Sequence, residues 1–229
     1  MSLVRSVKRH IDVPVEHFVL RVTGPEDVYD EARAAGMQFW EQLQSYAVRN
    51  RAFGTSKRPV TVPLDHPQPF RRMAAVAGAA GVGPMFTFRG ALVEHVGKLL
   101  SARLGEVVVS CHGDWFVQVS RRSRLSVHHP GGGPGPDVAV VIKPELGSQG
   151  IYSTMADPRP LDRAGPGVVV VAATPILADA VAAAVTASMS HPDAFDRALR
   201  FVQGVRGVFG AMIVEGERIG LAGGLELAA

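Results

Sequence analysis

The sequence predicts an α+β protein with a mixed or antiparallel sheet and packed helices. Three observations lead to this class: long segments with apolar residues at helical spacing, short segments rich in β-forming residues, and turn residues that join these short segments in pairs. Their order follows neither a strict strand–helix alternation nor an all-β pattern. Strand–helix–strand units occur in both halves of the chain, which suggests an internal duplication.

The length and composition allow one domain with its own core. The chain has 229 residues, of which 47% are hydrophobic, and we expect a single domain over residues 1–229. The alternative is a pair of intertwined subdomains that share one sheet. A single cysteine, Cys111, excludes a framework of internal disulfides.

Charge and hydropathy argue against two classes of partner. The net charge is only +3, and the basic residues are spread along the chain, so we expect no nucleic-acid binding. The N-terminal residues lack the apolar core of a secretory signal. The apolar segment 168–187 is interrupted by polar residues and a proline, as in a strand followed by a helix. We therefore expect a cytoplasmic protein without a membrane partner.

The first half is expected to form one strand and three helices. Gly24-Pro25-Glu26-Asp27 has the proline and acids typical of a helix start. Gly81-Val-Gly-Pro-Met85 ends a helix, because two glycines and a proline cannot continue it. The expected ranges are a strand at Val13–Thr23, helices at about 26–48, Phe70–Ala80 and Phe86–Leu104, and an irregular segment at 51–69 with room for a strand near Val60–Val62.

The second half alternates short strands with a pair of helices. Pro130-Gly-Gly-Gly-Pro-Gly-Pro136 is expected to be a mobile loop, and it is no phosphate loop because no Gly-Lys-Ser/Thr follows. Strands are expected at Glu106–Ser110, Trp115–Arg121, Arg124–His128, Val138–Lys143, Gly150–Thr154 and Val168–Ala172, helices at Ile176–Ser190 and Pro192–Gln203, and a closing hairpin from Val208–Glu215 to Leu221–Leu227.

A dense group of polar residues, Cys111-His112-Gly113-Asp114, lies between two expected strands. By residue type this is a turn, in which Gly113 would permit a positive φ or the close approach of a ligand. Neighbouring Cys111 and His112 point to opposite faces of a strand, so a shared metal is disfavoured. The same argument applies to His128 and His129.

Asp179 lies in a helix that is apolar on nearly every face. Burial of a carboxylate costs several kcal/mol unless it is paired or bound to a cation, which makes Asp179 a candidate ligand. The alternative is a carboxylate stabilised by the free N–H groups of its own helix start. Gly83, Pro84 and Met85 also have two interpretations: a helix start that binds an anion such as pyrophosphate, or a bend that joins two packed helices.

Three segments together resemble a little-characterised prokaryotic family related to ApbE. Ala80-Gly-Val-Gly-Pro-Met85 with Gly90-Ala-Leu-Val-Glu94 is similar to the family's helix entry, and Val107–Asp114 is similar to its strand ending in Asn-Gly-Gly-Asp. Val168–Val171 with Ala178-Asp179-Ala180 resembles the strand and helix shared with the flavin transferases. The resemblance covers roughly residues 10–228, and the order and spacing of the motifs make it fairly specific.

The resemblance implies a T-fold-like, ApbE-like architecture and a flavin site. ApbE enzymes bind FAD and magnesium, cleave the pyrophosphate and attach FMN to a threonine or serine of a target protein. By this resemblance Asp179 would help to hold the metal, and FAD or FMN would lie beside His112, Gly113 and Asp114, with Gly83, Pro84 and Met85 at a phosphate. Self-association into a homo-oligomer is also expected, with exposed edge strands as a route.

The departures from the transferase pattern bear on the activity. Ala183 stands where the transferases have a metal-binding threonine or serine, and Ile151-Tyr-Ser-Thr-Met155 replaces an expected Thr-Ser-Gly segment. Asp157-Pro-Arg-Pro160 lacks the histidine of the corresponding segment. Because magnesium needs several oxygen ligands, efficient flavin transfer is not expected. The sequence thus favours an ApbE-like protein that binds a flavin or related nucleotide, with a non-catalytic scaffold of the same fold as the alternative.

Overall fold

The computed structural model describes residues 9–127, 138–156, 165–189 and 193–228. Its main feature is an eight-stranded sheet with the order β1-β2-β3-β4-β7-β8-β9-β10, and every pairing between its described strands is antiparallel. A second sheet has the order β11-β6-β5. Among the two arrangements that the sequence allowed, mixed or antiparallel, the described strands adopt the antiparallel one.

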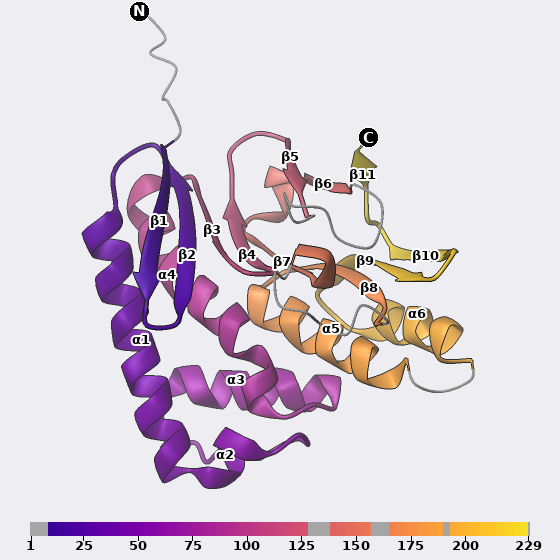
Figure 1. Ribbon diagram of the computed structural model, residues 1–229, viewed down its shortest axis with the longest axis horizontal. Coiled ribbons are helices and arrows are strands. Elements are labelled where there is room, and N and C mark those ends of the chain that lie inside the picture. Colours follow the sequence, from indigo (N-terminus) through magenta and orange to yellow (C-terminus); the bar gives the residue numbers. More distant parts are fainter. Residues whose placement is uncertain (1–8, 128–137, 157–164, 190–192, 229) are drawn as a thin grey trace, which may run out of the picture.

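The first half of the sheet consists of two hairpins separated by helices (Figure 1). The hairpins are β1 (Arg9–Val15) with β2 (Phe18–Gly24), and β3 (Val107–Cys111) with β4 (Asp114–Gln118). Between them lie α1 (Tyr29–Arg49), α2 (Arg51–Thr55), α3 (Gln68–Ala80), the 3₁₀ turn η1 (Pro84–Thr87) and α4 (Phe88–Leu104).

The second half repeats this order. Its hairpins are β7 (Gln149–Ser153) with β8 (Gly167–Ala172), and β9 (Val208–Glu215) with β10 (Arg218–Gly223). Between them lie α5 (Pro175–Ser188) and α6 (Ala194–Gly204). Each half therefore has a hairpin, a set of helices and a hairpin, with the four strands side by side in chain order. This arrangement agrees with the repeated units expected from the sequence.

The small sheet contains β5 (Ser123–Ser126), β6 (Ala139–Ile142) and β11 (Leu227–Ala228). Two further 3₁₀ turns, η2 (Pro144–Leu146) and η3 (Thr154–Ala156), flank β7. In the second half, α5 and α6 cover one face of the large sheet and the small sheet covers the other. The side chains of β8 point alternately to these two faces. Val168 and Val170 pack against residues of α5 and α6, whereas Val169 and Val171 pack with residues of the small sheet. The continuous valine run of β8 follows from burial on both faces.

Two expectations about the elements were wrong, and a third was right only in part. Val13–Thr23 is a hairpin and not one strand, because Glu16 and His17 form a tight turn with Glu16 at φ 51°. Residues 51–69 contain the helix α2, and no strand forms at Val60–Val62. The expected closing hairpin forms, since β10 pairs with β9, but its second strand ends at Gly223, and Leu227 belongs to β11, which pairs with β6 in the other sheet.

The expected loop at Pro130–Pro136, the histidines His128 and His129, and Asp157–Pro160 lie outside the described residues. Within the described ranges, no single helix is long and apolar enough to cross a membrane. One bent pair, Gln68–Ala80 with Pro84–Leu104, passes that test by length and composition.

Candidate functional site

Asp114 begins β4, directly after the tight turn that joins β3 to β4. Cys111 pairs with Asp114, so His112 and Gly113 are the two turn residues. The expected turn is confirmed, but the positive φ is that of His112, at 53°, and not that of Gly113. The carbonyl of Gly113 accepts a hydrogen bond from the N–H of Ser153 at 2.8 Å, which fixes the turn against the end of β7. Asp114 is fully buried as a result.

The carboxylate of Asp114 is paired with an arginine at the start of α4. Nε of Arg89 donates to Oδ2 of Asp114 at 2.9 Å, and both side chains are buried. Burial by itself lowers the pKa of Arg89, but the charges of Asp114 and Asp179 and the nearby Tyr152 raise that pKa well above its ordinary value. Arg89 therefore stays cationic, and it is close enough to interact with both aspartates.

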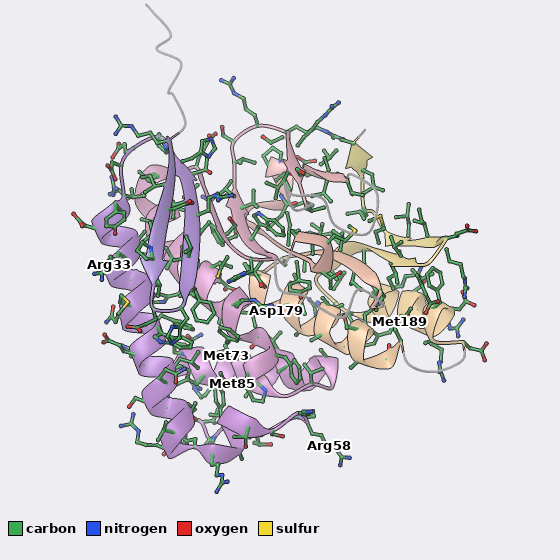
Figure 2. The ribbon with its side chains drawn as sticks, in the orientation of Figure 1. Arg33, Arg58, Met73, Met85, Asp179 and Met189 are labelled. Atoms are coloured by element: carbon green, nitrogen blue, oxygen red, sulfur yellow. The ribbon has the colours of Figure 1, made fainter. Side chains whose placement is uncertain are left out.

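Asp179 contacts the same turn of α4 from α5. Its Oδ2 accepts a hydrogen bond from the backbone N–H of Gly90 at 3.1 Å. Figure 2 shows Asp179 near the centre of the molecule, where α5 meets α4. The carboxylate thus bonds to the start of a neighbouring helix, whereas the start of its own helix is capped by Thr174, whose hydroxyl accepts from the N–H of Leu177. Asp114 and Asp179, the two acids singled out in the sequence, are therefore brought together around Arg89 and Gly90.

Close packing holds α4, α5 and β7 together at this place. A Cβ on Gly90 would lie 2.6 Å from the carbonyl oxygen of Pro175, the first residue of α5. A Cβ on Gly150, in β7, would lie 2.0 Å from the backbone nitrogen of Pro175. No L side chain fits at these distances, so both glycines allow the backbones to approach. The contacts at Pro175 therefore hold α5, which carries Asp179, close to α4, which carries Arg89 and Gly90.

Aromatic side chains border the charged group. Phe18 packs against Trp40 and Phe88 with ring centroids 5.1 and 5.4 Å apart, and its ring meets that of His112 edge-on at 6.2 Å. The guanidinium of Arg89 lies 5.5 Å from the ring of Phe88. The four rings are each partly exposed. The site thus combines buried charges with an adjacent aromatic surface, which the sequence reasoning did not foresee.

Gly83, Pro84 and Met85 serve the packing of this region. A Cβ on Gly83 would lie 1.9 Å from the carbonyl oxygen of Ser56, just after α2, and Pro84 is buried. Met85 packs against the core of the first half. The bend between packed helices is therefore present, as one of the two interpretations expected. Phosphate binding by these three residues stays a prediction.

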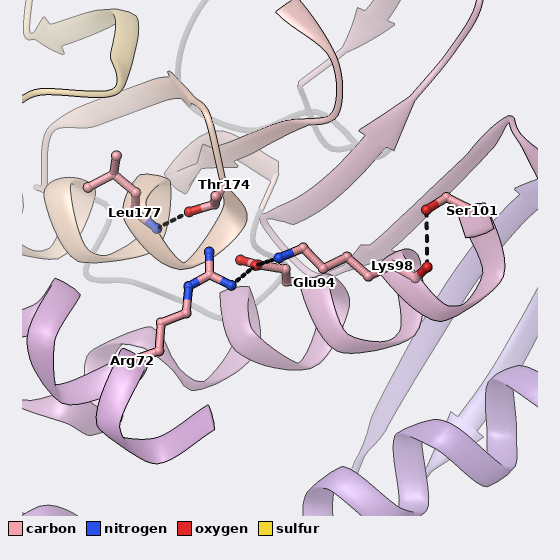
Figure 3. A network of polar contacts seen from close by, with 6 residues as sticks. All are labelled: Arg72, Glu94, Lys98, Ser101, Thr174 and Leu177. Atoms are coloured by element: carbon pink, nitrogen blue, oxygen red, sulfur yellow. Dashed lines mark hydrogen bonds and ion pairs between the residues drawn. The ribbon is translucent and has the colours of Figure 1, made fainter. Parts of the chain in front are cut away.

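A second buried charge lies one turn further along α4. Oε1 of Glu94 accepts from Nζ of Lys98 at 2.6 Å and from Arg72 of α3, as Figure 3 shows. Glu94 is only 2% exposed, whereas Arg72 and Lys98 are exposed by 30% and 51%, so the pairing joins α3 to α4 at the edge of the interior. His95 beside it packs against Phe39 with the rings tilted and their centroids 5.3 Å apart, and burial lowers the pKa of His95.

The donor set around Asp179 does not fit a magnesium ion. Among the described residues, no group of three or more His, Cys, Asp or Glu side chains is arranged to hold a metal. Ala183, one turn after Asp179, offers no oxygen, and the positive charge of Arg89 is already next to the carboxylates. Because Mg²⁺ requires near-octahedral oxygen ligands, these residues give no support to the predicted role of Asp179 as a metal ligand.

Arg89 and Tyr152 are the charged and polar residues of this site that the sequence reasoning missed. Arg89 could have been found by the signal that identified Asp179, because α4 is also buried on nearly all sides and a charge within such a helix needs a partner. Tyr152 carries no comparable signal, since it becomes part of the site only through the pairing of β7 with β4 opposite Asp114.

Two groups of known proteins are similar to this chain. A family model described as AbpE bacteria matches residues 5–199. The UPF0280 protein of Methanopyrus kandleri is 30% identical over 237 residues, covering 97% of this chain and 91% of that protein. The UPF0280 protein of Methanospirillum hungatei is 29% identical over 206 residues, covering 85% and 84%.

Solved structures of flavin transferases share the fold. The flavin transferase ApbE from Vibrio cholerae has a TM-score of 0.60 at 10% identity, covering 95% of this chain and 97% of that chain. The ApbE protein from Thermotoga maritima has a TM-score of 0.62 at 11% identity, covering 94% and 97%. At such identities the likeness concerns the fold alone, and it confirms the expected ApbE-like α+β architecture.

Proposed function

Because this chain belongs to the UPF0280 family, matched by the AbpE bacteria model, and has an ApbE-like fold, we propose that it binds a flavin nucleotide without transferring it. The ligand class comes from the proteins that share the fold, which are flavin transferases. The chemistry of this chain's own site supports binding more than transfer.

The observation that carries the proposal is the meeting of Asp114 and Asp179 at the first turn of α4, beside an aromatic surface. Charged groups in the interior are costly to desolvate, and a fold that needed only a packed core would gain little from three of them in one place. A flavin has a flat ring system with polar edges. Aromatic side chains bind the face of such a ring, and charged or hydroxyl groups bind its edge.

In this assignment the aromatic residues Phe18, Trp40, Phe88 and His112 contact the flavin ring. Asp114 and Tyr152, which are opposite one another on β4 and β7, provide polar groups at its edge. Transfer is left out because Ala183 removes an expected ligand oxygen and the described donor set does not suit magnesium. The described residues therefore give no support to magnesium-assisted flavin transfer.

Flavin binding is tested by titrating the purified protein with FAD, FMN, riboflavin and ADP, followed by flavin fluorescence or calorimetry. We expect a flavin to bind in the micromolar range and ADP to bind more weakly. Replacement of Phe88 by alanine should weaken flavin binding, whereas Asp196→Asn, an exposed change on α6, should leave it unaltered. Absence of binding of any flavin at high micromolar concentration would refute the proposal.

A scaffold without a ligand is the second candidate, and one observation favours it. The buried carboxylate of Asp114 is bonded to Arg89 and that of Asp179 to Gly90, so protein groups engage both acids. In that case their role is to join α4 to β4 and α5. Recovery of the protein with bound flavin, or a saturable flavin titration that Phe88→Ala abolishes, would exclude this candidate.

Self-association is part of the same proposal. β10 is at one edge of the eight-stranded sheet, and its residues Ile219 and Leu221 are exposed by 58% and 52%. An apolar edge strand can pair with a second copy through its unpaired backbone groups. We expect a homo-oligomer by light scattering, and Leu221→Lys should shift it towards the monomer. A wild-type protein that is monomeric at high concentration would contradict this expectation.

A further inference from the structure

The start of α4 brings one cation and two anions together in the interior. Nε of Arg89 donates to Oδ2 of Asp114 at 2.9 Å, and the N–H of the next residue, Gly90, donates to Oδ2 of Asp179 at 3.1 Å. Arg89 is 6% exposed, Asp179 is 4% exposed and Asp114 is fully buried. A guanidinium fixed on one helix therefore neutralises carboxylates from β4 and α5.

We propose that Arg89 takes the place of a divalent cation at this site, as an internal counter-ion for Asp114 and Asp179. Two buried carboxylates repel one another and need a positive charge nearby, which either a bound metal ion or a protein cation can supply. A guanidinium already bonded to one carboxylate excludes a metal from the same place by both its volume and its charge.

This inference goes beyond the proposed function and does not depend on it, because it concerns the charges of the protein itself. It accounts for two features together. The first is that Ala183 provides no ligand oxygen one turn after Asp179. The second is that α4 has a buried arginine, Arg89, directly before four apolar residues. Once a protein cation occupies the site, an oxygen at position 183 has no metal to bind.

The consequence is that removing the positive charge should create a metal site. In Arg89→Gln the two carboxylates lose their counter-ion, while the glutamine amide adds a neutral oxygen ligand. Carboxylate and amide oxygens are the ligands preferred by Mg²⁺ and Mn²⁺. In Arg89→Lys the charge remains, so no metal should enter.

The experiment measures Mn²⁺ binding by the loss of the free-ion signal in electron paramagnetic resonance, without any flavin. We expect no stoichiometric binding to the wild-type protein or to Arg89→Lys. We expect Arg89→Gln to bind one Mn²⁺ at least about tenfold more tightly, with a thermal midpoint that rises with Mn²⁺ concentration. The double variant Arg89→Gln with Asp179→Asn should lose that binding.

Two results would overturn the inference. One is stoichiometric, micromolar Mn²⁺ binding by the wild-type protein that Asp179→Asn removes. The other is a folded Arg89→Gln protein that binds Mn²⁺ no better than the wild type. If Arg89→Gln does not fold without metal, its recovery on refolding with Mn²⁺ supports the inference, and failure to recover counts against it. Flavin titrations have no part in these outcomes, so the two proposals can fail separately.

Discussion

The backbone N–H of Gly90 and the carboxylate of Asp179 are joined by a hydrogen bond of 3.1 Å, although 89 positions separate them in the chain. This bond links the first turn of α4, in the first half of the molecule, to α5 in the second half. The neighbouring residue, Arg89, bonds to Asp114 on β4. The charged site is thus also a junction between the two halves, and its residues should affect stability as well as binding.

Gly90→Ala should destabilise the fold. The new Cβ would meet the carbonyl oxygen of Pro175 at 2.6 Å, and neither backbone can move without disturbing the bond to Asp179. Overpacking of this kind costs about 1–3 kcal/mol, which urea unfolding can measure. Gly204→Ala is the matched control, because this helical glycine has no atom within 4 Å of the added carbon. Equal effects of the two changes would contradict the assigned contact.

The ion pair of Arg89 and Asp114 should show strong coupling in a double-mutant cycle. Arg89→Met or Asp114→Leu alone breaks this buried pair and should lower the free energy of unfolding by about 3–5 kcal/mol. The double variant should lose less than the sum of the two, since neither partner of the pair remains, and part of the loss should persist because Asp179 still lacks the charge of Arg89. Additive losses would show that the two side chains do not depend on one another.

Glu94→Gln should weaken the packing of α3 on α4. The neutral amide keeps the shape of Glu94 but no longer attracts Arg72 and Lys98, and we expect a loss of about 1–3 kcal/mol. Because Glu94 is buried, the loss should persist at high salt. Glu26→Gln, which removes an exposed partner of Arg103, serves as the control and should cost at most about 1 kcal/mol. A loss from Glu94→Gln that vanishes at high salt would show an exposed, screened pair.

His95 should make the protein less stable in mild acid. Burial lowers the pKa of His95 below its ordinary value of 6.5, so the unfolded chain takes up the proton first as the pH falls. The unfolded state then binds more protons than the folded one, and stability decreases as the pH drops below about 6.5. His95→Phe keeps a ring against Phe39 and removes this proton. Between neutral pH and a pH of about 5, the thermal midpoint of the wild type should fall more steeply than that of His95→Phe. Parallel profiles of the two proteins would contradict the lowered pKa of His95.

Much of the fold could be predicted from the sequence because its signals are local. Helical spacing of apolar residues located α1, the glycine-proline break at Gly81–Met85 separated α3 from α4, and the valine runs located β3 and β8. The errors arose where a signal was short. Glu16 and His17 divide one β-rich segment into a hairpin, and no sequence pattern marked α2 in the proline-containing stretch around it. A two-residue turn and a five-residue helix carry too few residues for a periodic pattern to appear.

The candidate site was predictable only in part. Asp179 and Asp114 stood out because an acid in an apolar helix, or after a glycine beside a strand, requires an explanation. Arg89 was missed, although its position in a buried helix carries the same signal. The aromatic residues Phe18 and Trp40 could not be assigned to the site, since their contact with Phe88 exists only after α1, α4 and β2 have packed.

The class of the fold, most of its elements, the family resemblance and the two acids could be read from the amino-acid order alone, because each depends on neighbouring residues or on motif order. The contacts of the acids became known only from the folded chain. Which helix start lies against Asp179, and which cation lies against Asp114, depends on the packing of α4 between β4 and α5. That packing is set by glycines that permit backbone contact at Pro175, and a distance between remote backbones is not encoded in any single segment.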